Sequence, residues 1–151
     1  MRGKLAVEEA GERHTANLLW RQQGENFEVD LWGPMGQGRI QLVRRGSAVA
    51  ILDGAGMVVT EGPSEQVMRE QLGWSLPLAV LPAWLQGNPL AGIPAHDLEY
   101  DDQGLLAAFT QLEWRVVYEQ HREAAGQWLP RRLSATGPAT RIRLVIAEWQ
   151  F

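Results

Sequence analysis

The 151-residue chain contains no cysteine, which excludes a disulfide framework, a thiolate metal site and a thiol nucleophile. No stretch of it reaches the roughly 18 consecutive apolar residues that a membrane-spanning helix requires. Positive charge is also scarce, since 14 Lys and Arg stand against 18 Asp and Glu for a net charge of −4. This balance is a poor electrostatic footprint for nucleic acid, and we expect no nucleic-acid partner.

Patterns typical of catalysis are missing as well. The three histidines, His14, His96 and His121, are scattered, and none has the spacing of a metal site. No serine lies in a Gly-x-Ser-x-Gly elbow, and the adjacent acidic pairs 8–9 and 101–102 favour a solvated edge and a turn over an acid and base pair. We expect no metal, no cofactor and no enzymatic activity, with a small enzyme acting on lipids or cell-wall material kept as a distant alternative.

Apolar residues and tryptophan are plentiful. The composition is 45% hydrophobic, with seven Trp against three Phe and two Tyr. The length and these proportions are those of a globular chain with a real core, and they predict a single domain over residues 1–151. Tryptophan suits core, interface and lipid-contact surfaces alike.

Alternation of apolar and polar residues, the period of a half-buried strand, dominates both halves of the chain. It is clearest in these segments: 14–21, 27–32, 39–45, 105–110, 114–119 and 141–146. Asp53-Gly54 between apolar runs predicts a hairpin, and residues 122–126 are predicted to form a loop. The links between about eleven strands are too short for crossover helices, so the sheet should be antiparallel.

Two short helices are predicted between the two strand regions. The first begins near Pro63 and stops before Gly73. The second covers about 77–86, and Pro82 is expected to kink or split it. A strongly curved sheet under two such helices would leave an apolar cavity suited to an acyl chain, with Trp84 inside. On residue type alone, plain core packing around Trp84 is the favoured interpretation, and the lipid cavity is the functional alternative.

Residues 33–38, Gly-Pro-Met-Gly-Gln-Gly, superficially suggest a phosphate-binding loop. They lack the Lys and Ser or Thr of such a loop, and they lead into a strand where a helix would be needed, so they indicate a hairpin turn. Turns are normally polar, yet Trp32, Pro34 and Met35 lie at or near this tip. An exposed turn of this kind should contact a partner, a ligand or a bilayer.

A series of short motifs runs from one end of the chain to the other. They are Arg2-Gly3-x-Leu5-Ala6-Val7, Trp20-x-Gln22, Phe27-x-Val29-x-Leu31, Gly33-Pro34-Met35-Gly36, Asp53-Gly54, Leu76-Pro77-Leu78 with Leu81, Trp84-Leu85, Gly87-Asn88-Pro89, Glu113-Trp114-Arg115-Val116-Val117-Tyr118, Leu129-Pro130, and Arg141-Ile142-Arg143-Leu144-Val145-Ile146 with Trp149. No single motif is diagnostic, but their order and spacing together resemble the LolB family of outer-membrane lipoproteins.

The resemblance implies an open antiparallel half-barrel with a helical lid over a hydrophobic cavity. LolB-like proteins accept acylated lipoproteins from the periplasmic carrier LolA and insert them into the outer membrane without covalent chemistry. The implied partners are therefore a LolA-like carrier, acyl chains and outer-membrane lipid, and we expect a monomer. A LolA-type periplasmic carrier or another half-barrel lipid-binding protein is the alternative, and it should lack an extended apolar loop.

The resemblance also implies a membrane-docking loop, because the family ties a protruding hydrophobic loop to membrane insertion. Met35 matches its key apolar residue, and Trp32 and Pro34 flank it. Alternation and helical spacing, independently of the family, predict the lining of the lipid cavity. These residues are Leu18, Trp20, Phe27, Val29, Leu31, Ile40, Leu42, Met68, Leu81, Trp84, Phe109, Trp114, Val116, Ile142 and Leu144. Several should be plain core, because alternation fixes the face but not the distance from the cavity mouth.

One departure from the family concerns the start of the chain. Family members have a signal peptide, a lipobox cysteine and a leading helical stretch before the first strand, and this sequence has none of them. We expect these segments to precede residue 1 in a longer parent protein, and an unanchored relative of the family is the alternative. On that expectation, the parent is lipid-anchored on the periplasmic face of the outer membrane.

Overall fold

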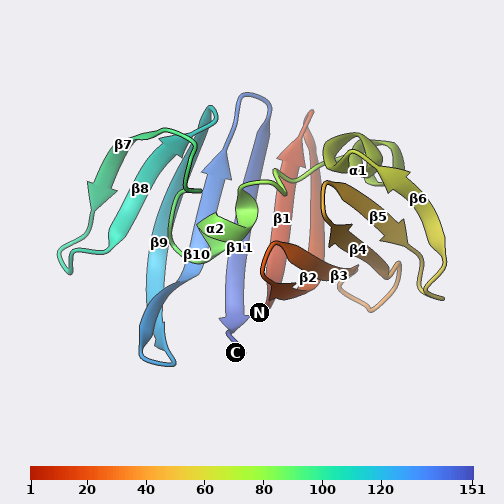
Figure 1. The fold of residues 1–151 in the computed structure, drawn as a ribbon, viewed down its shortest axis with the longest axis horizontal. Helices are drawn as coiled ribbons and strands as arrows, with labels where there is room; N and C mark the ends of the chain where they lie inside the picture. Colours follow the sequence, from red (N-terminus) through yellow and green to blue (C-terminus); the bar gives the residue numbers. More distant parts are fainter.

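The alternating segments fold into one antiparallel sheet of eleven strands, accompanied by two short helices, in a computed structural model that describes residues 1–151 (Figure 1). The elements are β1 (Arg2–Glu9), β2 (Glu12–Gln23), β3 (Asn26–Trp32), β4 (Ile40–Arg45), β5 (Ala48–Leu52), β6 (Val58–Gly62), α1 (Ser64–Leu72), α2 (Leu81–Leu85), β7 (Ala95–Tyr100), β8 (Leu106–Gln111), β9 (Trp114–Ala124), β10 (Gln127–Thr136) and β11 (Thr140–Glu148). The predicted strand number and antiparallel arrangement are confirmed.

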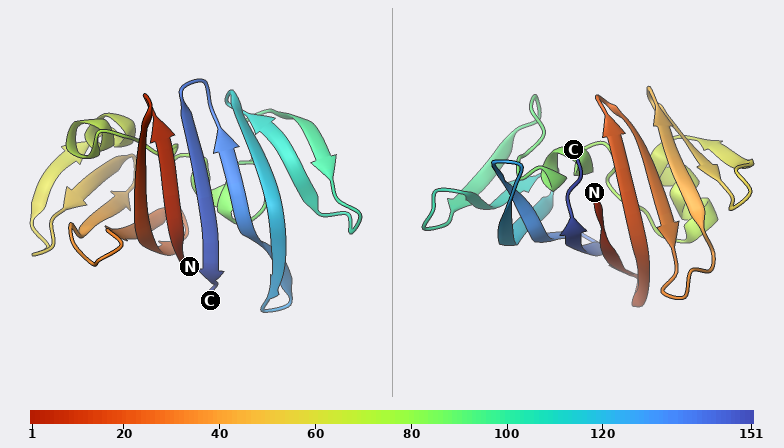
Figure 2. Two further views of the ribbon diagram at one scale, coloured as in Figure 1. Left: turned by 180° about the vertical axis from the view of Figure 1, so that it is seen from behind. Right: turned by 90° about the horizontal axis from the view of Figure 1, so that it is seen from below.

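The order of strands across the sheet is β6-β5-β4-β3-β2-β1-β11-β10-β9-β8-β7. The first and last strands pair at its centre, with Leu5 opposite Leu144 and Val7 opposite Ile142. Figures 1 and 2 show the sheet curling around α2 while β6 and β7 stay apart as free edges. The sheet is therefore the curved half-barrel that the sequence predicted.

The two faces of the sheet differ sharply at its centre. Along β11, Ile142 and Leu144 are buried while Arg141 and Arg143 are exposed. This alternation directs apolar side chains to the concave side and charged side chains to the convex side. The two central strands also approach closely, because any side chain on Gly3 would collide with the backbone of β11.

The helices follow the predicted signals in one case and depart from them in the other. α1 ends at Gly73, whose φ of 78° is the left-handed conformation that closes a helix. The second helix is confirmed inside the predicted range of 77–86, but α2 spans only Leu81–Leu85 and Pro82 does not kink it. Pro82 lies in the first turn of α2, where a missing N–H is tolerated, and residues 78–80 form a turn before it.

The predicted loop at 122–126 is also wrong. β9 continues to Ala124 and β10 begins at Gln127, so only Ala125 and Gly126 form the turn, both with positive φ. Two positive φ values are typical of the tight turns that join antiparallel strands. This hairpin extends below the rest of the sheet in Figure 1. Most of its residues are exposed, and therefore show no apolar alternation that could have revealed it.

The helices are short compared with the thickness of a bilayer. α1 has nine residues and α2 has five, and neither is long and apolar enough to cross a membrane.

Candidate functional site

Residues 74–94, which we call the lid segment, cross the concave side of the sheet and include α2. Figure 1 shows α2 in front of β10 and β11, and the chain leading to it passes in front of β1. Leu76, Leu78, Leu81 and Leu85 of this segment are almost completely buried, and they belong to the same apolar cluster as the strands. The lid segment is therefore packed as part of the core.

A small cavity remains between the lid segment and the sheet. Its ten lining residues are all apolar: Met1, Leu5, Leu18, Trp20, Val29, Leu31, Leu76, Leu81, Leu85 and Leu144. Its volume is about 10 Å³, roughly the space of one water molecule. The structure therefore shows a closed state, in which the lid segment leaves almost no free volume in this space.

Thirteen of the fifteen residues predicted to line the cavity are buried in the structure. Ile40 and Trp114 are the two exceptions, and both are half-buried against the same cluster. Six of the predicted residues line the small cavity directly: Leu18, Trp20, Val29, Leu31, Leu81 and Leu144. The other buried residues pack in the surrounding core, as the alternation pattern allowed.

Four residues of the cavity wall were missed in the sequence-based prediction. Leu5 alternates with less buried neighbours in β1, and Leu85 lies one helical turn after Leu81, so both carried a usable signal. Met1 and Leu76 lie outside any strand or helix and carried none.

Gln111, at the end of β8, holds the lid segment through four hydrogen bonds. Its Oε1 accepts from Trp84 Nε1 at 2.9 Å and from the Leu90 N–H at 3.0 Å. Its Nε2 donates to the carbonyl oxygens of Leu90 at 2.9 Å and Ile93 at 3.0 Å. The side chain is fully buried, and its hydrogen-bonding capacity is used completely on the lid segment.

Trp84 is fixed from a second side as well. The Tyr118 hydroxyl, on β9, donates to the Trp84 carbonyl oxygen at 2.7 Å, and burial raises the pKa of Tyr118, which keeps this donor neutral. The Trp84 ring also lies 6.2 Å from Phe109 and 6.1 Å from Trp114 between centroids. Strands β8 and β9 therefore bind one end of the lid segment with polar and aromatic contacts together.

The helix that leads into the lid segment is tied to the sheet by an ion pair. Glu9 Oε1 on β1 lies 2.8 Å from Arg69 Nη1 of α1 and accepts a hydrogen bond of 2.7 Å from Thr140 Oγ1. Burial alone would raise the pKa of Glu9, but the hydrogen bonds from Thr140 and Arg69 outweigh it and lower the pKa.

We expect Glu9→Gln to lower the free energy of unfolding at pH 7 by about 1 kcal/mol, because Arg69 stays half-exposed and solvent screens the pair. Because the pKa of Glu9 is lower in the folded chain, its ionised carboxylate stabilises the fold at pH values above the unfolded pKa of roughly 4.3. This stabilisation is lost as the pH falls through the folded pKa. The difference between the wild type and Glu9→Gln should thus shrink at acidic pH in urea titrations. If wild type and Glu9→Gln differ in unfolding free energy as much at pH 3 as at pH 7, the role of this ion pair is contradicted. An equal loss of unfolding free energy in Glu8→Gln would contradict it too.

The predicted docking loop is the turn between β3 and β4. The Gly33 N–H donates to the Gln37 carbonyl at 2.8 Å, and the Gly36 N–H donates to the Gly33 carbonyl at 2.9 Å. Gly36 has a φ of 82°, which favours glycine there. Met35 is 89% exposed at the tip and Pro34 is exposed beside it, whereas Trp32 is half-buried at the end of β3.

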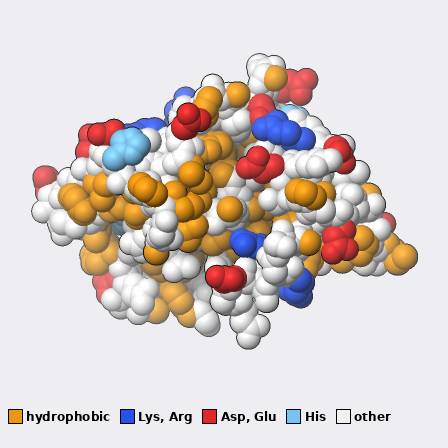
Figure 3. Space-filling model, turned by 45° about the horizontal axis from the view of Figure 1, so that its top comes forward, with side chains coloured by type: hydrophobic (Ala, Val, Ile, Leu, Met, Phe, Trp, Pro, Cys, Tyr) orange, Lys and Arg blue, Asp and Glu red, His pale blue; other side chains and the backbone are white.

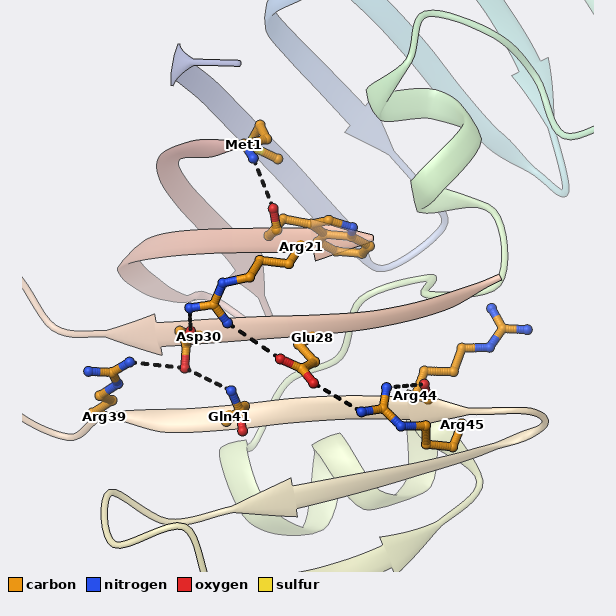
Figure 4. A network of polar contacts seen from close by, with 9 residues as sticks. Met1, Arg21, Glu28, Asp30, Arg39, Gln41, Arg44 and Arg45 are labelled. Atoms are coloured by element: carbon orange, nitrogen blue, oxygen red, sulfur yellow. Dashed lines mark hydrogen bonds and ion pairs between the residues drawn. The ribbon is translucent and has the colours of Figure 1, made fainter. Parts of the chain in front are cut away.

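A network of ion pairs on the convex face supports the base of this loop (Figure 4). Asp30, almost completely buried on β3, lies 3.1 Å from Arg21 and 3.3 Å from Arg39, and it accepts a hydrogen bond of 3.2 Å from Gln41. Arg21 also contacts Glu28 at 3.4 Å. Because Arg39 directly follows the turn, this network fixes where the loop leaves the sheet.

The histidines pack against aromatic rings or face solvent. His14 stacks on Trp74 at 6.1 Å, and His121 lies 5.5 Å from the Tyr118 ring. Burial lowers the pKa of His121, with Asp101 opposing the shift, while His96 is exposed. No three His, Asp or Glu side chains converge to hold a metal ion.

The chain matches the family described as outer membrane lipoprotein LolB over residues 1–149. A relative from Chromohalobacter salexigens, named outer-membrane lipoprotein LolB, is 35% identical over 98% of this chain and 68% of its own length. Two further relatives have the same name. The relative from Cellvibrio japonicus is 31% identical over 98% of this chain and 75% of its own length. The relative from Pseudomonas aeruginosa is 34% identical over 98% of this chain and 72% of its own length.

Similarity to solved structures is weaker. A DUF1329 family protein from Desulfovibrio piger covers 95% of this chain and 81% of its own, with 9% identity and a TM-score of 0.42, too low to inform function. The sequence comparisons carry the assignment instead, because the match extends from the first strand to the end of the last. The chain therefore belongs to the LolB family of outer-membrane lipoproteins.

Proposed function

We propose that this protein receives acylated lipoproteins from a LolA-like periplasmic carrier and inserts their acyl chains into the outer membrane. The observation that carries the proposal is the wholly apolar space between the concave face of the sheet and the lid segment. Figure 3 shows hydrophobic side chains running through the middle of the molecule, with acidic and basic side chains around them. An acyl chain would take over contacts that the lid segment makes in the closed state.

The transfer needs no catalysis, and we propose no enzymatic step. Each buried CH₂ group contributes roughly 0.8 kcal/mol, so that even one acyl chain is a large apolar ligand. Because the lid segment already fills the apolar space, an entering chain must displace it, which reduces the net affinity. Moderate affinity of this kind suits a protein that must release its ligand to a bilayer.

An exposed apolar loop distinguishes this function from that of a soluble carrier. A LolA-type carrier shares the cavity but has no reason to present Met35 almost fully to solvent. The β3–β4 turn therefore favours the protein that contacts the membrane over the one that carries lipoproteins to it.

We further propose that residues 1–151 act as one lipoprotein-binding domain, at the outer membrane and as a monomer. The pairing of β1 with β11 in the middle of the sheet supports the first point, because it joins both halves of the chain in one continuous sheet. The names of the relatives, all outer-membrane lipoproteins, support the location.

Met35→Glu is expected to impair delivery while leaving uptake unchanged. A charge at the tip opposes burial of the loop in lipid, and loss of a buried Met side chain lowers vesicle affinity about tenfold. The measurement is transfer of a fluorescent triacylated lipopeptide from the loaded protein to phospholipid vesicles, with binding of the same lipopeptide in solution as the second readout.

Met35→Leu is the matched control, because it keeps an apolar tip and should transfer the lipopeptide like the wild type. Equal loss of uptake and delivery in Met35→Glu would contradict the assignment of this loop to membrane contact.

A further inference from the structure

A second turn lies beside the docking loop. In the antiparallel order β3-β4-β5-β6, the β3–β4 turn and the β5–β6 turn leave the sheet at the same end. Figures 1 and 2 place both at one lower corner of the molecule, in views from opposite sides. The bases of the two turns are close together. A Cβ atom added to Gly54 would be in van der Waals contact with the Arg39 carbonyl oxygen, at 3.6 Å.

This second turn is as apolar as the first. Met57 is 67% exposed, Val58 is 60% exposed and Val59 is 51% exposed. Val58 and Val59 are adjacent, and both face solvent because the pairing with β5 shifts there by one residue. A shift of this kind is a β-bulge, which redirects side chains at a sheet edge.

The β5–β6 turn is also well ordered by hydrogen bonds. Asp53 and Met57 are joined through the Asp53 N–H, which donates to the Met57 carbonyl at 2.9 Å. The Asp53 carboxylate accepts from the N–H groups of Ala55 at 2.9 Å and Met57 at 3.0 Å. A turn that satisfies its backbone groups internally can enter a lipid interface at low cost, since few polar groups are left without partners.

The charged residues of the two turns, Arg39 and Asp53, lie at their bases, next to the strands. Residues 33–38 and 54–60 contain no Asp, Glu, Lys or Arg. Residues 33–38 and 54–60 together form what we call the apolar corner, and its larger exposed apolar side chains are Pro34, Met35, Met57, Val58 and Val59. Hydrophobic side chains also reach the right-hand tip of the molecule in Figure 3, the side on which β5 and β6 lie.

We propose that the β5–β6 turn is a second membrane contact, which enters the lipid interface together with the docking loop. This proposal rests on the proposed function, because it adds a second contact to the membrane-binding surface around Met35. Two protruding tips with flexible Met side chains fit a deformable lipid surface better than they fit a groove on a partner protein. Two attachment points also restrict the orientation of the sheet on the membrane more than a single loop does.

The absence of cysteine allows a direct test in the whole chain. Met35→Cys, Met57→Cys and Leu112→Cys are each labelled with an environment-sensitive fluorophore and mixed with neutral phosphatidylcholine vesicles. Leu112 is the matched control, because it is an exposed apolar residue at the β8–β9 turn, in the opposite half of the sheet. We expect a blue shift at positions 35 and 57, quenching there by lipids with a quencher in their acyl chains, and no change at 112.

The outcomes separate the two proposals. A response at 35 with none at 57 would overturn the second contact and keep the docking loop. A response at neither position would overturn both. A response at all three would indicate adsorption without orientation, and it would overturn the second contact. A shift at 57 that needs no vesicles and rises with protein concentration would indicate self-association through the β6 edge instead.

Substitution gives a second test without a label. Met57→Gln should reduce vesicle affinity about tenfold, as loss of one buried Met side chain predicts, and Met35→Gln together with Met57→Gln should reduce it about a hundredfold. Leu112→Gln should bind vesicles like the wild type, and thermal melts verify that each variant is folded. Full affinity in Met57→Gln would overturn the proposal.

Discussion

Gln111→Leu is expected to destabilise the folded protein and, at the same time, to tighten its binding of an acyl chain. Leucine fills the space but leaves the indole N–H of Trp84 and the backbone groups of Leu90 and Ile93 without their partners. A buried group that loses its partner costs about 1 to 3 kcal/mol, and water can reach the half-buried Leu90 and Ile93. The expected loss of unfolding free energy is therefore about 2 to 4 kcal/mol.

The expected gain in lipopeptide affinity has the same cause as the loss of stability. The four hydrogen bonds exist only while the lid segment is closed, so weakening them raises the population of molecules that can admit a ligand. We expect the apparent affinity for a triacylated lipopeptide to rise about tenfold. Urea titration and lipopeptide titration measure the two effects, and Gln103→Leu, at an exposed turn, is the control for both.

A variant that loses both stability and affinity would mean that Gln111 only supports the fold. Unchanged stability would mean that the lid segment is not bonded to β8 in solution. Only a loss of stability together with a gain in lipopeptide affinity fits the hypothesis that Gln111 holds the lid segment closed.

Trp84→Ala is expected to be the most destabilising single substitution in the lid segment. The side chain is fully buried, donates to Gln111 and packs against Phe109 and Trp114. Removing a buried Trp typically costs about 3 to 5 kcal/mol, because the cavity left behind collapses only in part. For a chain of this size the melting temperature should fall by about 10 °C.

Trp128→Ala is the matched control, because it removes the same side chain from a position that is 49% exposed on β10. Its cost should stay below about 1 kcal/mol. Equal melting temperatures for the two variants in calorimetry would show that Trp84 is not packed on the sheet and that the closed lid segment does not represent the protein in solution.

Alternation was sufficient to predict the sheet from the sequence. Strands such as β3 and β11 bury one face and expose the other, so their period is visible in the residues themselves. The connections are short, which left an antiparallel arrangement as the simplest outcome. The end of α1 was equally visible, because Gly73 is the residue type that its left-handed conformation favours.

The parts that could not be predicted lack such a period or depend on distant residues. The exposed hairpin of β9 and β10 has polar residues on both faces, so alternation could not extend the strands to Ala124 and Gln127. Gln111 is one polar residue at the end of a strand, and its partners are 18 to 27 residues away in the sequence. Its importance appears only once the lid segment is placed on the sheet.

The burial of the predicted lining residues followed from the sequence, but the closed state of the site did not. Alternation and helical spacing identified these apolar residues, and thirteen of the fifteen are buried. The sequence pattern could not show that the lid segment leaves a cavity of only about 10 Å³, because that volume depends on the positions of the loops around α2. The exposure of Met57 could not be predicted either, because it depends on the length of the turn between β5 and β6.

The most direct test of the central claim, that the lid segment covers a site for acyl chains, is a calorimetric titration of the folded chain. A triacylated lipopeptide, below its micelle concentration, is compared with the same peptide without acyl chains. Saturable binding of the acylated peptide alone, with a negative heat-capacity change from apolar burial, is the predicted result. Binding of neither peptide, or equal binding of both, by a chain whose melting curve shows it to be folded would contradict the claim.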